Sequence, residues 1–270
     1  MKIGFIDYYL SEWHANNYPA WISAAAEKLG IDAELAYAWA EDDVSPVDGV
    51  TTDGWCRTYG TTRCASIEEL CELSDCIFIL APSNPEKHLP YASRVLKYGK
   101  PTYIDKSFAP SVGEAERIYE IAEKYGTPMF SSSALRYAAE LRDFVGVSSI
   151  TTVGGGRSIE EYIVHQAEMV EKLLGIGSCG VRAERDGEAI VFTVSYPDGR
   201  SARMCYSPDA AFGLSSEKKD VAISSDFFPA LIADILAFFR DSMPRVEKND
   251  TLEVMRLREM AIAAEKTLSE

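Results

Sequence analysis

The sequence lacks the features that mark membrane proteins and nucleic-acid-binding proteins. No apolar run approaches the roughly 20 residues that cross a bilayer, since Leu231 to Phe239 is short and Asp234 interrupts it. Basic residues are few, 27 Lys and Arg against 42 Asp and Glu, which gives a formal net charge of −15. Because no basic stripe is present to neutralise phosphates, we expect neither a nucleic acid nor a membrane as a partner.

Cysteine pairs and an amino-terminal leader are also missing. The 6 cysteines include no CxxC pair, and several lie in apolar strand or helix patterns, as reduced and buried thiols do. The sequence begins directly on a strand pattern, Lys2 to Ile6, with no signal peptide before it. These absences predict a cytoplasmic protein.

The chain has 270 residues, of which 47% are apolar and 26% charged, which is the composition of a globular protein with one large or two ordinary domains. Strand and helix patterns alternate along its first half, with Glu41 to Gly60 as a turn-rich loop. Such alternation predicts an α/β fold with a Rossmann-like, doubly wound parallel sheet. The expected strands are Lys2–Asp7, Ala33–Trp39, Cys76–Leu80, the run that ends at Lys106, and Pro128–Ser131; the expected helices are Trp13–Leu29, a short one from Ser66, Pro85–Tyr98 and Ser111–Tyr125.

The pattern changes after about Ser131. Asp-Gly pairs at Asp186 and Asp198 separate three strand patterns and predict a small antiparallel meander. We therefore predict a Rossmann-like domain over residues 1–131 and a smaller α/β domain with a mostly antiparallel open sheet over residues 132–270. The other elements expected there are helices at 134–144, 158–174, 227–240 and 251–267 and a strand at 149–153.

One face of the meander bears on self-association. Val191, Phe192, Val194 and Tyr196 make it rich in apolar residues. An exposed apolar sheet face is a natural self-association surface, and a symmetric dimer is the simplest way to cover it. We therefore expect a homodimer or a higher homo-oligomer.

The turn after the first strand lacks the glycine fingerprint of dinucleotide-binding domains. In GxGxxG the glycines let the backbone approach the pyrophosphate at a helix N-terminus. Here Asp7 and Tyr9 stand where glycines are expected, and their side chains would crowd a phosphate. The turn can equally be one that caps the first helix and binds nothing. Glu41, beyond the second strand, either meets the adenosine ribose hydroxyls or is an exposed loop acid.

Lys106 and His165 are the candidate catalytic residues. Lys106 ends an apolar strand pattern, where open α/β sheets bind ligands, although it can also be a solvated residue at the start of a helix. His165 lies within a largely apolar helix, where a packing role is the alternative. Glu161, four residues earlier on the same face, could orient the imidazole, or serve only in the capping box of that helix. Glu161, His165 and Glu168 have a spacing that a metal could use, but no further His or Cys cluster joins them and we expect no metal.

At these positions the chain resembles the glucose–fructose oxidoreductase/inositol dehydrogenase (Gfo/Idh/MocA) family. Asp75–Pro82, Gly99–Pro101 and Asp105–Ser107 are similar to the family's D-x-V-x-I-x-T-P, G-K-x-V and E-K-P motifs. Glu161–His165 is similar to its D-x-x-x-H motif, with Glu in place of Asp. The resemblance follows nearly the whole chain in order, although Ser107 replaces the proline and the second domain is short.

The resemblance implies a Rossmann domain, an open-sheet α/β domain, and NAD(P)-dependent oxidation of a sugar or cyclitol hydroxyl. It implies Lys106 and His165 as the pair near the substrate hydroxyl and the nicotinamide, with Glu161 beside them. The residues expected to line NAD or NADP are Gly4, Ile6, Asp7, Tyr9, Glu41, Ala81, Pro82 and Asp105.

Two hypotheses for the function remain at this point. The first is an NAD(P)-dependent oxidoreductase that acts on a sugar, a cyclitol or a related polyol, and the retained Lys106 and His165 favour it. The second is a non-catalytic family member that has lost dinucleotide binding and serves as a ligand-binding or assembly subunit. The side chains at Asp7 and Tyr9 favour this second hypothesis.

Overall fold

The computed structural model of the chain describes residues 1–269. They form two compact units, each made of two segments of the chain. The first unit comprises Met1–Ser131 and Phe228–Glu247, and the second comprises Ser132–Phe227 and residues 248–269. Residues 228–247, which were expected in the second domain, therefore belong to the first unit.

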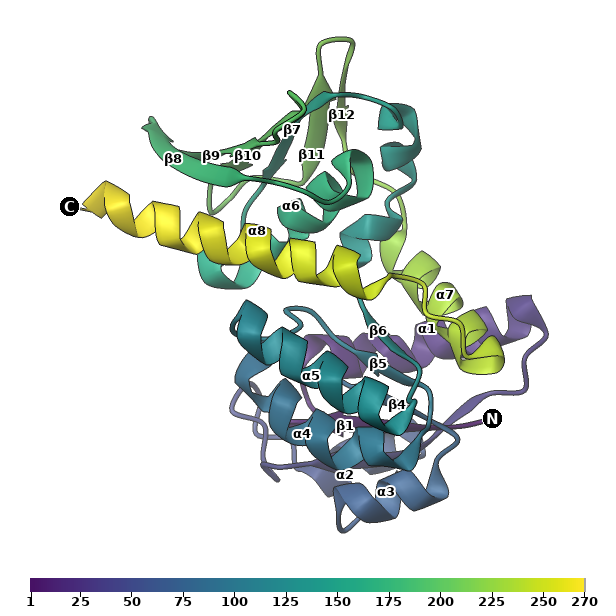
Figure 1. Ribbon diagram of the computed structural model, residues 1–270. Helices are drawn as coiled ribbons and strands as arrows, with labels where there is room; N and C mark the ends of the chain where they lie inside the picture. The colour runs from purple at the N-terminus through teal and green to yellow at the C-terminus, as the bar shows by residue number, and fades with distance from the viewer. Residues whose placement is uncertain (270) are drawn as a thin grey trace. The chain divides into compact units, whose positions relative to one another are not determined.

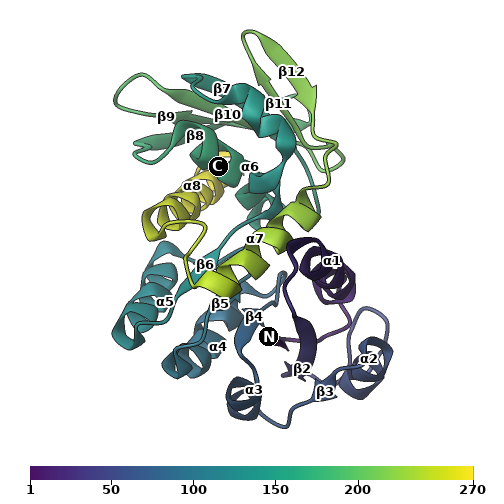
Figure 2. The ribbon, with the colours of Figure 1, turned by 90° about the vertical axis from the view of Figure 1, so that its right-hand side faces the viewer.

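The first unit is built on a parallel sheet with the strand order β3-β2-β1-β4-β5-β6 (Figures 1 and 2). Its helices α1 and α2 lie on one face, together with α7, and α3, α4 and α5 lie on the other (Figure 2). This is the doubly wound α/β arrangement that the alternation predicts. The strands are β1 (Lys2–Asp7), β2 (Glu34–Ala40), β3 (Thr62–Arg63), β4 (Cys76–Ile79), β5 (Thr102–Ile104) and β6 (Met129–Ser131); the helices are α1 (Trp13–Leu29), α2 (Thr52–Tyr59), α3 (Ile67–Leu73), α4 (His88–Val95), α5 (Val112–Tyr125) and α7 (Phe227–Asp241).

Local capping explains where several of these helices begin. Ser66 and Ser111 accept hydrogen bonds from the N–H groups of Glu69 and Glu114, as their capping-box spacing predicts. The segment 41–60 is not the continuous loop that was expected, because α2 forms within it. Thr51 starts α2 by accepting a hydrogen bond from the Gly54 N–H, a signal that the many turn residues around it conceal.

One row of aromatic side chains crosses the sheet of the first unit. Phe5, Phe78, Tyr103 and Phe130 are paired in register on the neighbouring strands β1, β4, β5 and β6. Their ring centroids are 5.1, 5.5 and 5.3 Å apart in that order, and each pair packs edge to face. All four side chains are fully buried, so the row is the core between this sheet and the helices on that face.

The same row explains why α7 joins the first unit. Phe239 packs edge to face on Phe78 at 5.1 Å, and Phe238 packs likewise on Phe130 at 5.0 Å. The sequence shows that 227–240 is an apolar helix but not which core receives it, and its place late in the chain suggested the second domain. No helix among residues 1–269 is both long enough and apolar enough to cross a membrane.

The second unit holds a mixed sheet with the strand order β12-β11-β7-β10-β9-β8. It is mostly antiparallel, as predicted, and only β7 and β10 pair in parallel. The predicted helix at 134–144 is instead two short 3₁₀ segments, Ala134–Tyr137 and Ala139–Phe144. The elements are β7 (Ser149–Gly154), α6 (Ile159–Leu174), β8 (Gly180–Asp186), β9 (Ala189–Ser195), β10 (Ser201–Tyr206), β11 (Gly213–Ser216), β12 (Lys219–Ala222) and α8 (Lys248–Lys266).

Helices α6 and α8 cover one face of this sheet (Figure 1). Phe192, Val194 and Tyr196 lie in the core that these helices form with the sheet, and Val191 is also only 2% exposed. The apolar face that was expected to drive self-association is therefore used within the chain. Sequence alternation identifies an apolar face but does not show whether a helix of the same chain or a second copy covers it.

Gly155 follows β7 at a point of close backbone contact. A Cβ built there would lie 1.8 Å from the backbone oxygen of Ser207, which cannot swing away as a side chain can. We therefore expect Gly155→Ala to destabilise the second unit by about 1–3 kcal/mol, the usual cost of overpacking. Gly180→Ala is the matched control, because nothing lies within 4 Å of its added Cβ. Urea unfolding measures both variants, and equal midpoints would contradict the prediction.

Candidate functional site

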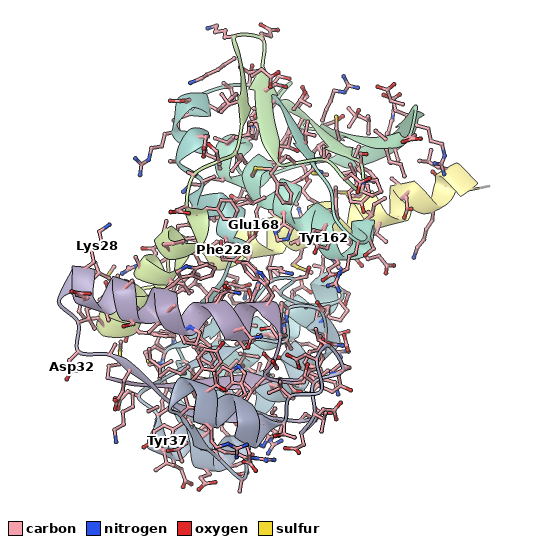
Figure 3. The ribbon with its side chains drawn as sticks, turned by 180° about the vertical axis from the view of Figure 1, so that it is seen from behind. Lys28, Asp32, Tyr37, Tyr162, Glu168 and Phe228 are labelled. Carbon is pink, nitrogen blue, oxygen red and sulfur yellow. The ribbon has the colours of Figure 1, made fainter. Side chains whose placement is uncertain are left out.

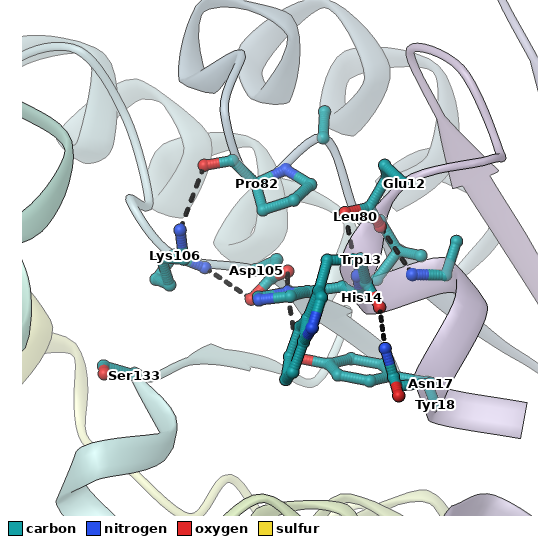
Figure 4. A network of polar contacts seen from close by, with 12 residues as sticks. Glu12, Trp13, His14, Asn17, Tyr18, Leu80, Pro82, Asp105, Lys106 and Ser133 are labelled. Atoms are coloured by element: carbon teal, nitrogen blue, oxygen red, sulfur yellow. Dashed lines mark hydrogen bonds and ion pairs between the residues drawn. The ribbon is translucent and has the colours of Figure 1, made fainter. Parts of the chain in front are cut away.

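Buried charged side chains gather at the carboxyl ends of β1, β4 and β5 (Figure 4). Parallel strands end at the same edge of a sheet, where α/β proteins bind their ligands. The structure brings several of the predicted site residues together there. They are Asp7, Ala81, Pro82, Asp105 and Lys106, and Glu12 and His14 join them from the turn before α1 and its first turn.

Asp105 and His14 form the central contact of this cluster. The Nδ1 atom of His14 lies against Oδ2 of Asp105, and the Tyr18 hydroxyl lies 3.1 Å from the same Nδ1. Burial pushes the pKa of Asp105 up, but the attraction and hydrogen bond of His14, together with Lys106, outweigh it and hold the pKa below its ordinary value. These contacts therefore favour the ionised carboxylate of Asp105.

Lys106 lies where the strand pattern places it, just beyond β5, and its side chain is 8% exposed. Its backbone N–H donates to Oδ1 of Asp105 at 2.8 Å, and its ammonium donates to the carbonyl oxygen of Pro82 at 3.3 Å. Lysine is rarely buried this far without partners. A desolvated ammonium at the ligand-binding edge of the sheet can donate a hydrogen bond to a bound oxygen.

Asp7 ends β1 and is 1% exposed. Its Oδ1 accepts hydrogen bonds from the N–H groups of Tyr8 at 2.7 Å and Ala81 at 3.0 Å, which ties β1 to the end of β4. Its Oδ2 is buried with no hydrogen-bond partner in the structure. Burial and then the charge of Glu12 raise the pKa of Asp7 well above its ordinary value, which favours the protonated acid.

Glu12 caps the N-terminus of α1 with its own side chain. Its Oε2 accepts from the His14 N–H at 2.8 Å, and its Oε1 accepts from the Ala15 N–H at 2.5 Å. The residue is only 9% exposed, and burial raises its pKa, opposed by the attraction of His14. Sequence reasoning missed both Glu12 and His14. Glu12 could have been noticed, because Asp7, Tyr9 and Glu12 have the spacing of the three glycines in GxGxxG.

The remaining residues expected to line a dinucleotide have other partners. A Cβ on Gly4 would lie 2.5 Å from Leu70 Cδ2, so the glycine lets α3 pack closely on β1. Ile6 is fully buried within β1, and the ring of Tyr9 lies 5.7 Å from that of Tyr8. Glu41 accepts from the Lys87 ammonium and from the Tyr91 hydroxyl at 2.7 Å, and Lys87 chiefly lowers its pKa.

The second unit places His165 beside a serine. Its Nδ1 lies 2.6 Å from the Ser133 hydroxyl, and that hydroxyl also accepts from the Leu135 N–H at 3.3 Å. Glu161, expected to orient His165, binds Arg157, and its N–H donates to Ser158 as its capping box predicts. Sequence reasoning missed Ser133. The run of serines after β6 carries no spacing that points to a helix elsewhere in the chain.

Glu168 supports this serine from α6 (Figure 3). Its Oε1 accepts from the Ser133 N–H at 2.8 Å, and Arg136 contacts both Glu168 and Glu171. Burial raises the pKa of Glu168 to about 7, against the pull of Arg136 and of the Ser133 N–H. Within residues 1–269, no three His, Cys, Asp or Glu side chains are placed to hold a metal ion.

Comparison with known proteins supports the resemblance found in the sequence. Residues 42–132 match the model of the Gfo/Idh/MocA oxidoreductase family, described as an NAD-binding Rossmann fold. A search of curated proteins finds no match.

Solved structures match over nearly the whole chain. UDP-N-acetylglucosamine 3-dehydrogenase of Acidithiobacillus ferrooxidans aligns with 98% of this chain and 96% of its own at 15% identity and a TM-score of 0.75. A putative myo-inositol dehydrogenase of Sinorhizobium meliloti aligns with 99% of this chain and 98% of its own, at 13% identity and a TM-score of 0.72. A biliverdin reductase of Synechocystis, solved with biliverdin and NADP+, aligns with 98% of this chain and 98% of its own, at 13% identity and a TM-score of 0.70. At these identities the likeness is one of fold.

The family's cofactor can be tested against the turn between β1 and α1. Rossmann domains seat the dinucleotide's diphosphate on N–H groups at the start of this helix. In this chain Glu12 accepts from those N–H groups, at His14 and Ala15, and Asp7 stands beside it. The residues as they stand therefore do not fit a diphosphate in that position.

The raised pKa of Glu168 makes the stability of the second unit depend on pH. An acid whose pKa rises on folding, here from 4.5 to about 7, adds stability that is present below pH 4.5 and is lost as the pH rises through 7. We expect the free energy of unfolding to fall from about pH 4.5 to pH 7, by up to about 1.4 kcal/mol per pH unit, and to level off above pH 7. In Glu168→Gln this fall should be smaller.

Denaturant unfolding at several pH values measures the slope, which separates titration from the altered contact with Arg136. Glu160→Gln is the matched control, because Glu160 is an exposed acid on the same helix. A slope in Glu168→Gln equal to that of Glu160→Gln and of the unmodified chain would show that Glu168 does not titrate in this range.

Proposed function

We propose that this chain, whose first domain matches the Gfo/Idh/MocA oxidoreductases, oxidises or forms a hydroxyl group on a sugar, a cyclitol or a related polyol. The family match supports the oxidoreductase class and, with it, NAD or NADP as the cofactor class. The observation that carries the proposal is the buried ammonium of Lys106 at the carboxyl end of β5, next to the ionised Asp105.

Lys106 has a role that follows from its chemistry. Oxidation of an alcohol removes the hydroxyl proton, and negative charge develops on the oxygen as the proton leaves. An ammonium that is already desolvated stabilises that charge more than one in water, because it needs little reorganisation. Asp105 fixes the backbone of Lys106 through the N–H bond of 2.8 Å and keeps a negative charge near the ammonium. We propose Lys106 as the donor to the substrate oxygen.

His165 is proposed as the proton acceptor, and Ser133 as the residue that positions it. Imidazole is suited to accept a proton near neutral pH. A ring whose Nδ1 carries the hydrogen and donates it to Ser133 presents Nε2 as the acceptor. The distance of 2.6 Å between Ser133 Oγ and His165 Nδ1 allows this arrangement. Glu168 in turn fixes Ser133 through its backbone N–H.

A second candidate function is favoured by one specific observation. The carboxyl groups of Glu12, at the start of α1, and of Asp7, at the end of β1, fit a family member that has lost dinucleotide binding and holds a ligand without turning it over. Titration of the protein with NADH and NADPH, followed by an activity screen on polyols, separates the two candidates.

The catalytic assignment is tested by steady-state kinetics on whichever polyol the protein oxidises. Lys106→Ala and His165→Ala should each lower kcat by about 100-fold or more, because each removes a group that acts on the reacting oxygen. Ser133→Ala should lower kcat less and shift the pH profile of kcat/KM, since it changes the surroundings of the imidazole. Lys97→Ala, at an exposed lysine of the first unit, is the control. Unchanged rates in Lys106→Ala and His165→Ala would show that these two residues have a structural role only.

Assembly and location are part of the proposal. We propose a homodimer from the family resemblance alone, because the apolar face that suggested it packs within the chain. Light scattering at micromolar concentration would test this, a monomeric mass being the contrary result. A cytoplasmic location is consistent with the cysteines, because all six that the structure describes are free thiols.

A further inference from the structure

The N-terminus of α1 is already filled by a side chain of the protein. The first turn of this helix exposes N–H groups that no backbone carbonyl can reach, and Glu12 binds those of His14 and Ala15 with its two oxygens. A diphosphate would seek the same N–H groups, because the helix dipole and the free donors favour any anion there. A carboxylate and a phosphate present the same kind of acceptor. Glu12 and a diphosphate therefore exclude each other at this point.

The length and burial of Glu12 set it apart from an ordinary helix cap. Ser, Thr, Asp and Asn are the usual N-cap residues, and each would satisfy these donors with a shorter side chain. Glu12 instead brings a carboxylate into a site where it is 9% exposed and where Asp7 is 1% exposed. Placing a second acid beside a buried one costs free energy, so helix capping alone does not account for it.

Asp7 provides independent evidence that this edge is organised around anion-binding donors. Its Oδ1 accepts from two further backbone N–H groups, those of Tyr8 in the turn and of Ala81 after β4. Its Oδ2 is buried without a hydrogen-bond partner. Four backbone N–H groups that face the ligand edge of the sheet are thus bound by two side-chain carboxyl groups (Figure 4 shows the part formed by Glu12).

We propose that Glu12 is an internal occupant of the diphosphate position, so that a nicotinamide dinucleotide binds tightly only when Glu12 gives up the N–H groups of His14 and Ala15. The inference builds on the proposed function, because it concerns how the cofactor of that function gains its site. It assigns Glu12 the role of an autoinhibitory contact within the first unit. Asp7 remains in place throughout, since its Oδ1 links β1 to β4.

The test is isothermal titration of the full-length protein with NADH and with NADPH. Glu12→Ser keeps a good N-cap, removes the carboxylate and opens the space that it fills. We expect it to bind NADH about tenfold or more tightly than the unmodified protein. Glu12→Gln keeps the shape without the charge, so its gain should be smaller. Glu120→Gln, an exposed acid on α5, removes one charge elsewhere in the unit and should change nothing.

Each outcome decides the inference. Equal affinities in Glu12→Ser and the unmodified protein, whether both bind or neither binds, would overturn it. If Glu12→Ser fails to fold, as judged by circular dichroism and thermal unfolding, then Glu12→Gln must bind NADH more tightly than Glu120→Gln for the inference to stand. Failure of the proposed function looks different: Glu12→Ser would gain NADH affinity but oxidise no polyol. Tight binding and turnover in the unmodified protein, with Glu12→Ser unchanged, would instead leave the function standing and remove the inference.

Discussion

The row of four aromatic rings across β1, β4, β5 and β6 is the interaction on which the first unit depends. The rings of Phe5, Phe78, Tyr103 and Phe130 pack edge to face in strand register. Each such pair adds about 0.5–1.5 kcal/mol beyond the burial of its apolar area. A strand shifted along its neighbour would break the row, so the rings also fix the relative heights at which the strands end.

The row also connects the core of the first unit to its charged cluster. Tyr18 of α1 packs edge to face on Phe78 at 6.0 Å, and its hydroxyl lies 3.1 Å from His14 Nδ1, one helical turn earlier. The helix position that this packing sets is therefore the one that brings His14 to Asp105. Phe228, which is labelled in Figure 3, extends the contact. It stacks on Trp21 and lies against the ring of His14. Hydrophobic packing and the geometry of the buried charges are in this way set together.

The sequence could predict local features, such as where helices and strands lie. It could not predict contacts between residues that are distant in the chain. Alternation and capping patterns place β1, α1, α5 and α6 correctly, because periodicity and N-caps act within a few residues. The place of α7 depends on Phe238 and Phe239 meeting Phe130 and Phe78, which lie more than a hundred residues earlier. The contact of Ser133 with His165 is equally invisible in the sequence, because nothing in their spacing points to it.

The candidate site shows the same division. The position of Lys106 just beyond β5 could be predicted, because the end of an apolar strand can be read from the sequence. His14 was missed because it gains its meaning only from Asp105, a residue on a different element. Gly4 was assigned to the cofactor by its position near the turn, whereas the structure shows that α3 packs on it. A glycine has no side chain chemistry, so only its neighbours reveal why it is there.

The contacts that hold the fold and the turn between β1 and α1, where a dinucleotide's diphosphate would bind, involve different residues, so this turn can change while the fold is kept. The aromatic row, the serine caps and the packing at Gly4 involve no atom of the turn between β1 and α1. That turn needs only its backbone donors satisfied, and side-chain carboxylates satisfy them as well as a bound anion does. A structure can therefore match dehydrogenases at a TM-score of 0.75 with 15% identity while the few N–H groups that would hold a diphosphate serve its own Glu12. Similarity of fold reflects the packing contacts, whereas the function depends on what the N–H groups of this turn bind.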